Sequence, residues 1–234
     1  MNACTREHLN TLKQPISHTE ENYLKAIFKL SEMNRNNVTT NAISEKLKTT
    51  AASVTDMLKK LSGKKLLHYE KYYGVSLTEK GKKLAKDLIR KHRLWETFLV
   101  EKLNFSWDEV DELAEQLEHI NSEILTDRID DFLGFPKFDP HGDPIPDKDG
   151  NIAYHEDVTL DKMKKGDEGI IAGVIDHSTQ FLQYLGKIQL VINTKIRVKD
   201  DEDYDQSKII LINDKKELIL SQKVASNLLV RKTK

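Results

Sequence analysis

The first third of the chain repeats apolar residues at helical spacing and then changes to a shorter alternating pattern. Residues 19 to 33, TEENYLKAIFKLSEM, carry apolar side chains every three or four positions behind Thr19, a possible N-cap. Residues 39 to 47 and 50 to 62 predict two shorter helices. Residues 66 to 78, LLHYEKYYGVSLT, predict two short strands. This order of elements is typical of a winged helix-turn-helix.

Three further helices are predicted after the hairpin. The first spans residues 79 to 103, EKGKKLAKDLIRKHRLWETFLVEKL. Ser106 and Glu109 have the spacing of a capping box for a helix that carries residues 115 to 119, and residues 122 to 133 predict another helix. Helices with broad apolar faces and no further partner in their own chain commonly associate with a second copy. We therefore expect a homodimer.

Regular helical structure is expected to stop at a proline-rich segment. Residues 134 to 150, GFPKFDPHGDPIPDKDG, hold four of the five prolines. Short runs rich in Val and Ile follow and are typical of a small β-barrel. The fold class is thus mainly α with a β C-terminal module. The predicted domains are a winged helix-turn-helix at 1–77, a helical domain at 78–140, a proline-rich linker at 141–154 and the β-barrel at 155–234.

The net charge of -1 conceals a strong asymmetry along the 234 residues. Residues 1 to 93 hold 19 Lys and Arg against 9 Asp and Glu, whereas residues 94 to 234 hold 18 against 29. The first part therefore has a net charge of +10 and the rest -11. A basic N-terminal part indicates a polyanionic partner for that part, and the acidic remainder suits cation binding or solubility.

Cysteine content and hydropathy favour a cytoplasmic protein. Cys4, the single cysteine, excludes a disulfide framework and a cysteine-ligated iron-sulfur cluster within one chain. The sequence has no apolar run of about 18 residues and no apolar segment typical of a signal peptide at its N-terminus. We expect no membrane partner.

The second helix of a helix-turn-helix enters the major groove of DNA, and its N-terminal residues meet the base edges. Lysines near its end and in the wing would contact phosphates. The alternative is a solvated lysine-rich face on a winged helix that binds protein. The candidate base readers are Thr50, Ala52, Ser53, Thr55 and Asp56, and the candidate phosphate contacts are Lys59, Lys60, Lys64, Lys65 and Lys71.

Two groups of carboxylate and imidazole side chains have the spacing of metal ligands. Glu115, Glu118 and His119 would share one helical face, because residues three and four apart are neighbours on a helix. His92 and Glu96 are four apart in the preceding long helix. Two carboxylates and an imidazole suit a divalent ion. The alternative is that these are ordinary exposed charges, since 32% of the chain is charged.

Several segments together resemble the diphtheria toxin repressor family of metal-dependent regulators. In chain order they are TEENYLKAIFKL, SVTDMLKKL, LTEKGKKLA, RKHRLWE, EQLEH and DPHGDPIP. Each segment is short, but their common order extends over nearly the whole chain. The resemblance implies that residues 78–140 bind metal and dimerise and that residues 155–234 form an SH3-like domain of the FeoA type.

The resemblance also implies two metal sites. Glu115 stands where iron-responsive members have a cysteine and manganese-responsive members a glutamate, which points to Mn²⁺, with Fe²⁺ as the alternative and Zn²⁺ binding in vitro. The implied primary ligands are Asn22, Glu115, Glu118 and His119, and the implied ancillary ligands are His92, Glu96, Asp111, His177 and Gln180.

Two positions depart from the family's pattern, and one of them has an alternative nearby. Manganese-type members carry an aspartate where this chain has Asn22, and some carry an acidic ligand where it has Lys25. Glu21 is the alternative ligand from the first helix. His141, in the proline-rich segment, is interpreted as structural. If the barrel ligands reach the ancillary site, metal would brace the barrel against the helical domain.

The sequence therefore predicts a cytoplasmic, homodimeric, manganese-dependent repressor that binds a double-stranded DNA operator and controls metal-ion homeostasis. One alternative is a winged-helix regulator of a non-metal ligand, and another is an Fe²⁺-responsive repressor. A metallohydrolase is disfavoured, because the sequence contains no H-E-x-x-H, G-x-S-x-G or phosphate-binding loop.

Overall fold

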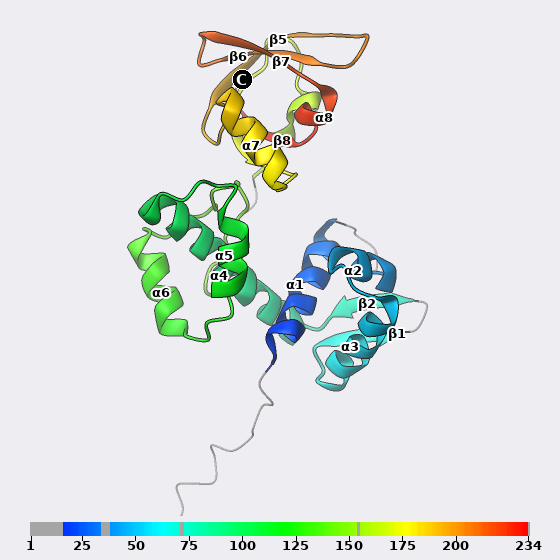
Figure 1. Cartoon of the computed structure of the whole chain (residues 1–234). Coiled ribbons are helices and arrows are strands. Elements are labelled where there is room, and N and C mark those ends of the chain that lie inside the picture. The colour runs from blue at the N-terminus through cyan, green and yellow to red at the C-terminus, as the bar shows by residue number, and fades with distance from the viewer. Residues whose placement is uncertain (1–15, 34–37, 71–72, 154, 234) are drawn as a thin grey trace, which may run out of the picture. The chain divides into compact units, whose positions relative to one another are not determined.

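The structure is a computed structural model that describes residues 16–33, 38–70, 73–153 and 155–233. The chain divides at Lys86 into an N-terminal unit and a C-terminal unit, which are coloured blue to cyan and green to red in Figure 1. Each unit has its own core and is described by itself. Lys71 and Cys4 lie outside the described residues.

The N-terminal unit is a winged helix-turn-helix, as the sequence predicted. Buried Leu24, Ile27, Leu58 and Leu61 belong to its apolar core. The two strands pair antiparallel with Leu67 opposite Leu77, which forms the wing. The elements are α1 (His18–Met33), α2 (Thr40–Lys46), α3 (Ala51–Gly63), β1 (Leu67–Glu70) and β2 (Gly74–Leu77).

The beginning of α1 differs from the prediction. The helix starts at His18, so Thr19 lies inside it and is not its N-cap. The backbone N–H of Glu20 donates to Ser17 Oγ at 3.3 Å, and Ser17 N–H donates to Glu20 Oε2 at 2.8 Å. This reciprocal pair is a capping box, and it satisfies two N–H groups at the helix start.

Helix α4 (Glu79–Leu103) begins directly after the wing and depends on a glycine there. Thr78 Oγ1 accepts from Gly81 N–H at 3.2 Å, as expected of a residue that caps the first turn. A Cβ on Gly81 would lie 2.0 Å from the carbonyl oxygen of Leu66. Only glycine permits this close approach between α4 and the start of the wing.

The next helices are α5 (Val110–Leu117) and α6 (Glu123–Phe132). Ser106 N–H donates to Glu109 Oε2 at 3.0 Å, which is one of the two hydrogen bonds of the expected capping box. Residues 107–109 form a turn, so this bond lies before the helix and not in its first turn. Glu118 is the C-cap of α5 and His119 lies beyond it. His119 therefore lies just after the helix, and its assignment as a ligand beside Glu115 and Glu118 stays a prediction.

The C-terminal part of the second unit is a six-stranded antiparallel sheet, which confirms the predicted β-module. The strand order is β3-β8-β4-β5-β6-β7. Its core contains fully buried Leu160, Met163, Ile171 and Leu185. The elements are β3 (Val158–Thr159), η1 (Leu160–Lys162), β4 (Glu168–Val174), α7 (Thr179–Ile188), β5 (Lys195–Asp201), β6 (Lys208–Ile212), β7 (Lys216–Leu220), α8 (Gln222–Ala225) and β8 (Leu228–Lys232).

The segment DPHGD, residues 139–143, lies directly against β4 of this sheet. Val174 N–H donates to the carbonyl oxygen of His141 at 3.0 Å. Gly142 has φ +89, and a Cβ there would lie 2.1 Å from the carbonyl oxygen of Ala172. The glycine thus allows the loop to approach the strand closely and fixes the orientation of the neighbouring side chains. Among the described residues, none of the helices has the length and apolar character needed to cross a bilayer.

Candidate metal centre and DNA-binding face

His92, on α4, is buried at the centre of four carboxylates, of which Glu96 and Glu118 are buried and Asp111 and Glu115 are partly or largely exposed. Its Nδ1 is 2.6 Å from Glu118 Oε2 and 3.9 Å from Glu115 Oε2. Its Nε2 is 3.3 Å from Glu96 Oε1 and 3.4 Å from Asp111 Oδ1. Glu118 is fully buried, so these charges interact in a low-dielectric environment. The two predicted groups of ligands therefore meet at a single imidazole.

Electrostatics show that this group of carboxylates favours a positive charge. Burial by itself would lower the pKa of the His92 imidazole, but hydrogen bonds to Asp111, Glu118 and Glu96 raise that pKa to about 10. The same contacts keep the Glu96 carboxyl pKa below its ordinary value despite its burial. In the absence of a metal, the protonated imidazolium of His92 provides the positive charge that a bound divalent ion would otherwise provide.

A second group of possible ligands lies beside the first, and the sequence analysis did not expect it. Glu96, Asp139 and His141 each offer one ligand atom, all within 4.8 Å of one another, and all three residues are buried. His141 Nδ1 is 3.5 Å from Glu96 Oε1. His141 was interpreted as structural, whereas the structure places it in this group, with its loop held by Arg93 of α4 on one side and by β4 on the other.

The hydrogen bonds of His141 prepare one ring nitrogen for a ligand. Its Nε2 lies 2.7 Å from the carbonyl oxygen of Trp107, which can only accept, so Nε2 carries the proton. Nδ1 is buried and has no hydrogen-bond partner. A histidine that donates one N–H to a backbone carbonyl and presents a bare second nitrogen is the common arrangement of a metal ligand.

Asp139 adds to this second group a buried carboxyl whose ionised form is disfavoured without a cation. Burial raises the pKa of the Asp139 carboxyl well above its ordinary value, and the nearby charges of Glu96 and Asp143 raise it further. Arg93 Nε, 3.5 Å from Asp139 Oδ2, offsets only part of this effect. A divalent cation would relieve the repulsion between the buried carboxylates, so these residues fit such an ion.

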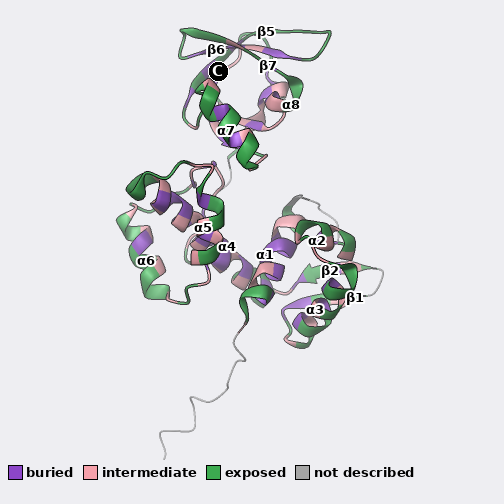
Figure 2. Ribbon diagram, viewed as in Figure 1, coloured by how far each residue is buried: buried purple, intermediate pink, exposed green. Residues whose placement is uncertain are grey.

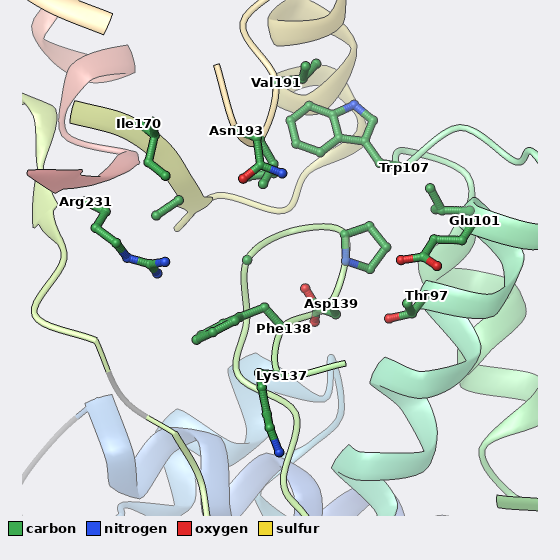
Figure 3. A pocket seen from close by; sticks show the side chains of 15 residues that line it. Thr97, Glu101, Trp107, Lys137, Phe138, Asp139, Ile170, Val191, Asn193 and Arg231 are labelled. Carbon is green, nitrogen blue, oxygen red and sulfur yellow. The ribbon is translucent and has the colours of Figure 1, made fainter. Parts of the chain in front are cut away.

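A cavity of about 600 Å³ borders this second group at Asp139. Asp139 and Thr97 line it, together with residues of α4 and of the sheet. Figure 3 shows Thr97 and Glu101 on one side, Ile170 and Arg231 on the opposite side, and the loop that carries Asp139 between them. A metal site needs such a route for the ion and its water ligands.

The remaining predicted ligands lie at different distances from these groups. His119 Nε2 is 3.9 Å from Glu118 Oε1, next to the first group. His177 stacks on His141 with ring centroids 5.1 Å apart, and its Nε2 is 4.0 Å from Asp143 Oδ1. Gln180 is exposed and lines another hollow, beside Tyr184 and other residues of α7 and α8. The structure thus brings His177, but not Gln180, towards the second group.

Asn22, the predicted ligand from the first helix, belongs to the N-terminal unit. Its Oδ1 is buried and has no hydrogen-bond partner. A buried carbonyl oxygen without a partner is energetically unfavourable unless an ion or water satisfies it. This is consistent with a ligand role, and the role itself stays a prediction.

The N-terminal part of α3 presents small polar residues to solvent. Thr50 is the N-cap of the helix and accepts from Ser53 N–H at 3.2 Å. Thr55 Oγ1 donates to the carbonyl oxygen of Ala51 at 2.9 Å. Ala52, Ser53 and Asp56 are exposed, as base-reading residues must be. Their assignment as readers of bases stays a prediction.

The predicted phosphate-contacting lysines do not have equivalent surroundings. Lys59 and Lys65 are exposed, and Lys59 Nζ is 3.5 Å from Asp56 Oδ1. Lys64 and Lys60 form ion pairs with Glu20, a buried carboxylate that the sequence analysis did not select. The signal that could have found Glu20 is its capping-box spacing from Ser17.

A winged helix-turn-helix, together with a helical domain that carries buried carboxylates around imidazoles, defines a metal-responsive DNA-binding regulator. Comparisons with known proteins agree with this class. Three family models match in succession: the iron dependent repressor N-terminal DNA binding domain at residues 16–75, the iron dependent repressor metal binding and dimerisation domain at 78–147, and the FeoA domain at 158–232.

A solved structure matches nearly the whole chain, and relatives match parts of it. A manganese-dependent transcriptional repressor in complex with manganese has 33% identity and a TM-score of 0.81, and the match covers 91% of this chain and 99% of that one. The HTH-type transcriptional regulator MntR of Oceanobacillus iheyensis is 37% identical over 119 residues, which cover 51% of this chain and 80% of MntR. A probable metal transport system membrane protein of Chlamydia trachomatis is 44% identical over 71 residues, 30% of this chain and only 16% of that protein.

The chain belongs to the family of iron-dependent repressors, to which the diphtheria toxin repressor and MntR-type regulators also belong. It is a metal-dependent DNA-binding repressor and not an enzyme, so the predicted family, fold class and type of function are confirmed. The partners of this family are operator DNA, a divalent metal and a second copy of the chain, as expected. The domain limits at residues 77, 140 and 154 stay predictions.

Proposed function

We propose that the protein is a cytoplasmic repressor that responds to Mn²⁺ and controls genes of metal-ion homeostasis. The observation that carries this proposal is the group of oxygen and nitrogen ligands around His92 and His141, in which the described part of the chain places no thiolate. Hard carboxylate ligands favour the Mn²⁺ end of the first-row series more than a site with a thiolate does, although availability in the cell also selects the ion.

For the first ion, the proposed ligands are Glu115, Glu118 and His119, with the oxygen of Asn22 added from the N-terminal unit. His92 Nδ1, which contacts Glu118, is an additional candidate, and Mn²⁺ would there replace the imidazolium proton. A bound ion activates the repressor only if it binds the DNA-competent arrangement more tightly than other arrangements. The ligand from the N-terminal unit would provide that preference.

For the second ion, the proposed ligands are Glu96, Asp139 and His141. This set keeps Glu96 from the predicted ancillary ligands and takes Asp139 and His141, from the loop between the helical part and the sheet, in place of His92, Asp111, His177 and Gln180. His177 and Asp143 lie next to it and are suited to hold its water ligands. The sheet would then be braced on the helical part through His141, whose carbonyl oxygen bonds to β4.

The dimer is proposed to form through the helical part of the C-terminal unit. The buried apolar cluster there is small, with Leu94, Ile129 and Ile145 at its centre. Large apolar side chains remain exposed on and near α6, where Figure 2 shows exposed residues, and an apolar surface of this kind is typical of an interface. The exposed residues are Leu103, Ile124, Phe132 and Phe135.

Fluorescence anisotropy on promoter DNA tests the proposal directly. We expect tight binding with Mn²⁺, weaker activation by Fe²⁺ and little binding without a metal. Operator binding that does not depend on metal would contradict the proposal and support a regulator of a non-metal ligand. A stronger response to Fe²⁺ than to Mn²⁺ would support the iron-responsive alternative, which the names of the matching family models favour.

Glu115→Cys provides a test of metal selectivity. A thiolate at this half-exposed position is expected to raise the response to softer ions relative to Mn²⁺. The measurement is the ratio of the metal concentrations that give half-maximal anisotropy with Fe²⁺ and with Mn²⁺. An unchanged ratio would show that position 115 does not set selectivity.

A further inference from the structure

Glu20 joins the first turn of α1 to the last turn of α3 through two ion pairs. Its Oε1 lies 2.7 Å from Lys64 Nζ and 3.4 Å from Lys60 Nζ. Lys64 Nζ also donates to Glu20 Oε2 at 2.9 Å. The carboxylate is buried, with 1% of its side chain exposed, against 19% for Lys64 and 55% for Lys60. Lys64 is therefore held more closely than Lys60.

The capping box keeps this carboxylate in place. Oε2 accepts the N–H of Ser17 at 2.8 Å while the N–H of Glu20 donates to Ser17 Oγ, so the side chain is held on both sides. A lysine that contacts a DNA phosphate would therefore have to leave Glu20, because Glu20 itself is not free to follow it. Leaving a buried carboxylate without its partner is costly.

DNA affinity depends on how many cations remain available for phosphates. Each phosphate that a protein neutralises contributes about 0.9 to the slope of log affinity against log salt. A lysine already neutralised by a buried carboxylate contributes less to this slope than an exposed one. Lys64 and Lys60 lie at the end of the helix that enters the major groove, where such contacts are expected.

We propose that Glu20 takes the place of a DNA phosphate at Lys64 and draws Lys60 away from the duplex. Glu20 thereby weakens the sequence-independent part of DNA binding and lowers its dependence on salt. This role goes beyond repression by metal, because it acts on binding to any duplex. Its consequence is a larger ratio of specific to non-specific affinity, since base contacts at the start of α3 are not reduced.

The test is Glu20→Gln in the full chain with Mn²⁺ present. Glutamine keeps the capping-box geometry but removes the charge. Anisotropy with a short labelled duplex of mixed sequence is measured over a salt range of about 50 to 200 mM. We expect a slope steeper by about 0.9 for each released lysine, and tighter binding at the lower salt. An unchanged or shallower slope would overturn the proposal.

Two matched variants separate this effect from a general change of charge. Glu45→Gln removes the same charge from an exposed position of α2, so its slope should stay close to that of the parent chain. Lys59→Gln removes a lysine of the same helix as Lys60 whose ion pair with Asp56 is exposed on both sides and therefore weak, so this variant should lower the slope by about 0.9.

Lys64→Gln gives a second, independent readout. Lys64→Gln should lower the salt slope more in the Glu20→Gln chain than in the parent chain. The reason is that Lys64 becomes available to a DNA phosphate only when Glu20 has lost its charge. Equal effects in both backgrounds would show that Glu20 does not withhold Lys64. If the Glu20→Gln chain does not fold, the two single variants Lys64→Gln and Lys59→Gln of the parent chain are compared instead. Lys64→Gln must then lower the salt slope less than Lys59→Gln does. An equal decrease would overturn the proposal.

Discussion

Replacing Glu118 with glutamine is expected to abolish metal-activated binding to operator DNA. Glu118 is the fully buried carboxylate nearest to His92 and is proposed to ligate the first ion. Loss of a direct ligand should weaken Mn²⁺ binding by about 100-fold or more, since even changes behind the ligands weaken metal affinity 10- to 100-fold. Anisotropy on promoter DNA across a Mn²⁺ titration measures the effect.

The control for this variant is Glu112→Gln, an exposed glutamate of the same helix outside the group of ligands. It should activate as the parent chain does. The fold should survive Glu118→Gln, because His92 retains Glu96 and Asp111 at its other ring nitrogen. Thermal unfolding without metal checks this. Full activation of Glu118→Gln by Mn²⁺ would show that the first ion binds elsewhere.

Asp139→Asn is expected to stabilise the metal-free protein and to reduce the additional stability that Mn²⁺ provides. The raised pKa of the Asp139 carboxyl shows that the fold disfavours its ionised form, so removing the charge should stabilise the metal-free protein. The amide oxygen can still accept from the N–H groups of His141 and Asp143. With Mn²⁺ at about 100 times its dissociation constant, each occupied site should add about 2.7 kcal/mol to the free energy of unfolding of the parent. The variant should lack the contribution of the second site, which contains Asp139.

Thermal unfolding with and without Mn²⁺, together with calorimetric stoichiometry, tests this prediction. The parent should bind two ions per chain and Asp139→Asn one. Asp131→Asn, which changes an exposed aspartate of α6 in the same way, should leave both quantities as in the parent. A variant that still binds two ions with unchanged affinity would rule out Asp139 as a ligand.

The parts of the fold that could be predicted from the sequence are those that depend on local periodicity. Helix α3 spans Ala51–Gly63, one residue from the predicted 50 to 62, because its buried face repeats within the helix itself. The end of α5 could not be predicted in this way. The helix stops at Leu117, and the spacing from Glu115 to His119 would have suited a longer helix equally well.

The metal ligands show the same difference between residues that share one helix and residues that are brought together by packing of distant segments. His92 and Glu96 share one helix, and the structure brings them together as their spacing suggested. His141 comes to Glu96 because contacts between distant parts of the chain hold its loop, among them the bond from Val174 on β4 and the ion pair from Arg93 on α4 to Asp143. Spacing along the chain carries no information on such a contact. The DPHG motif could be recognised in the sequence, but the position of its Asp139 and His141 beside Glu96 depends on how the loop packs.

The close approach of Gly142 to β4 restricts how this protein can change during evolution. The same short loop offers ligand atoms on one side and backbone hydrogen bonds to the sheet on the other. An insertion there, or any side chain at position 142, would disturb both together. Variation in ion preference should therefore arise by exchange of single side chains such as Asp139, while loop length stays constant. Tolerance to inserted residues should be found instead at distant tips such as the exposed turn around Tyr204.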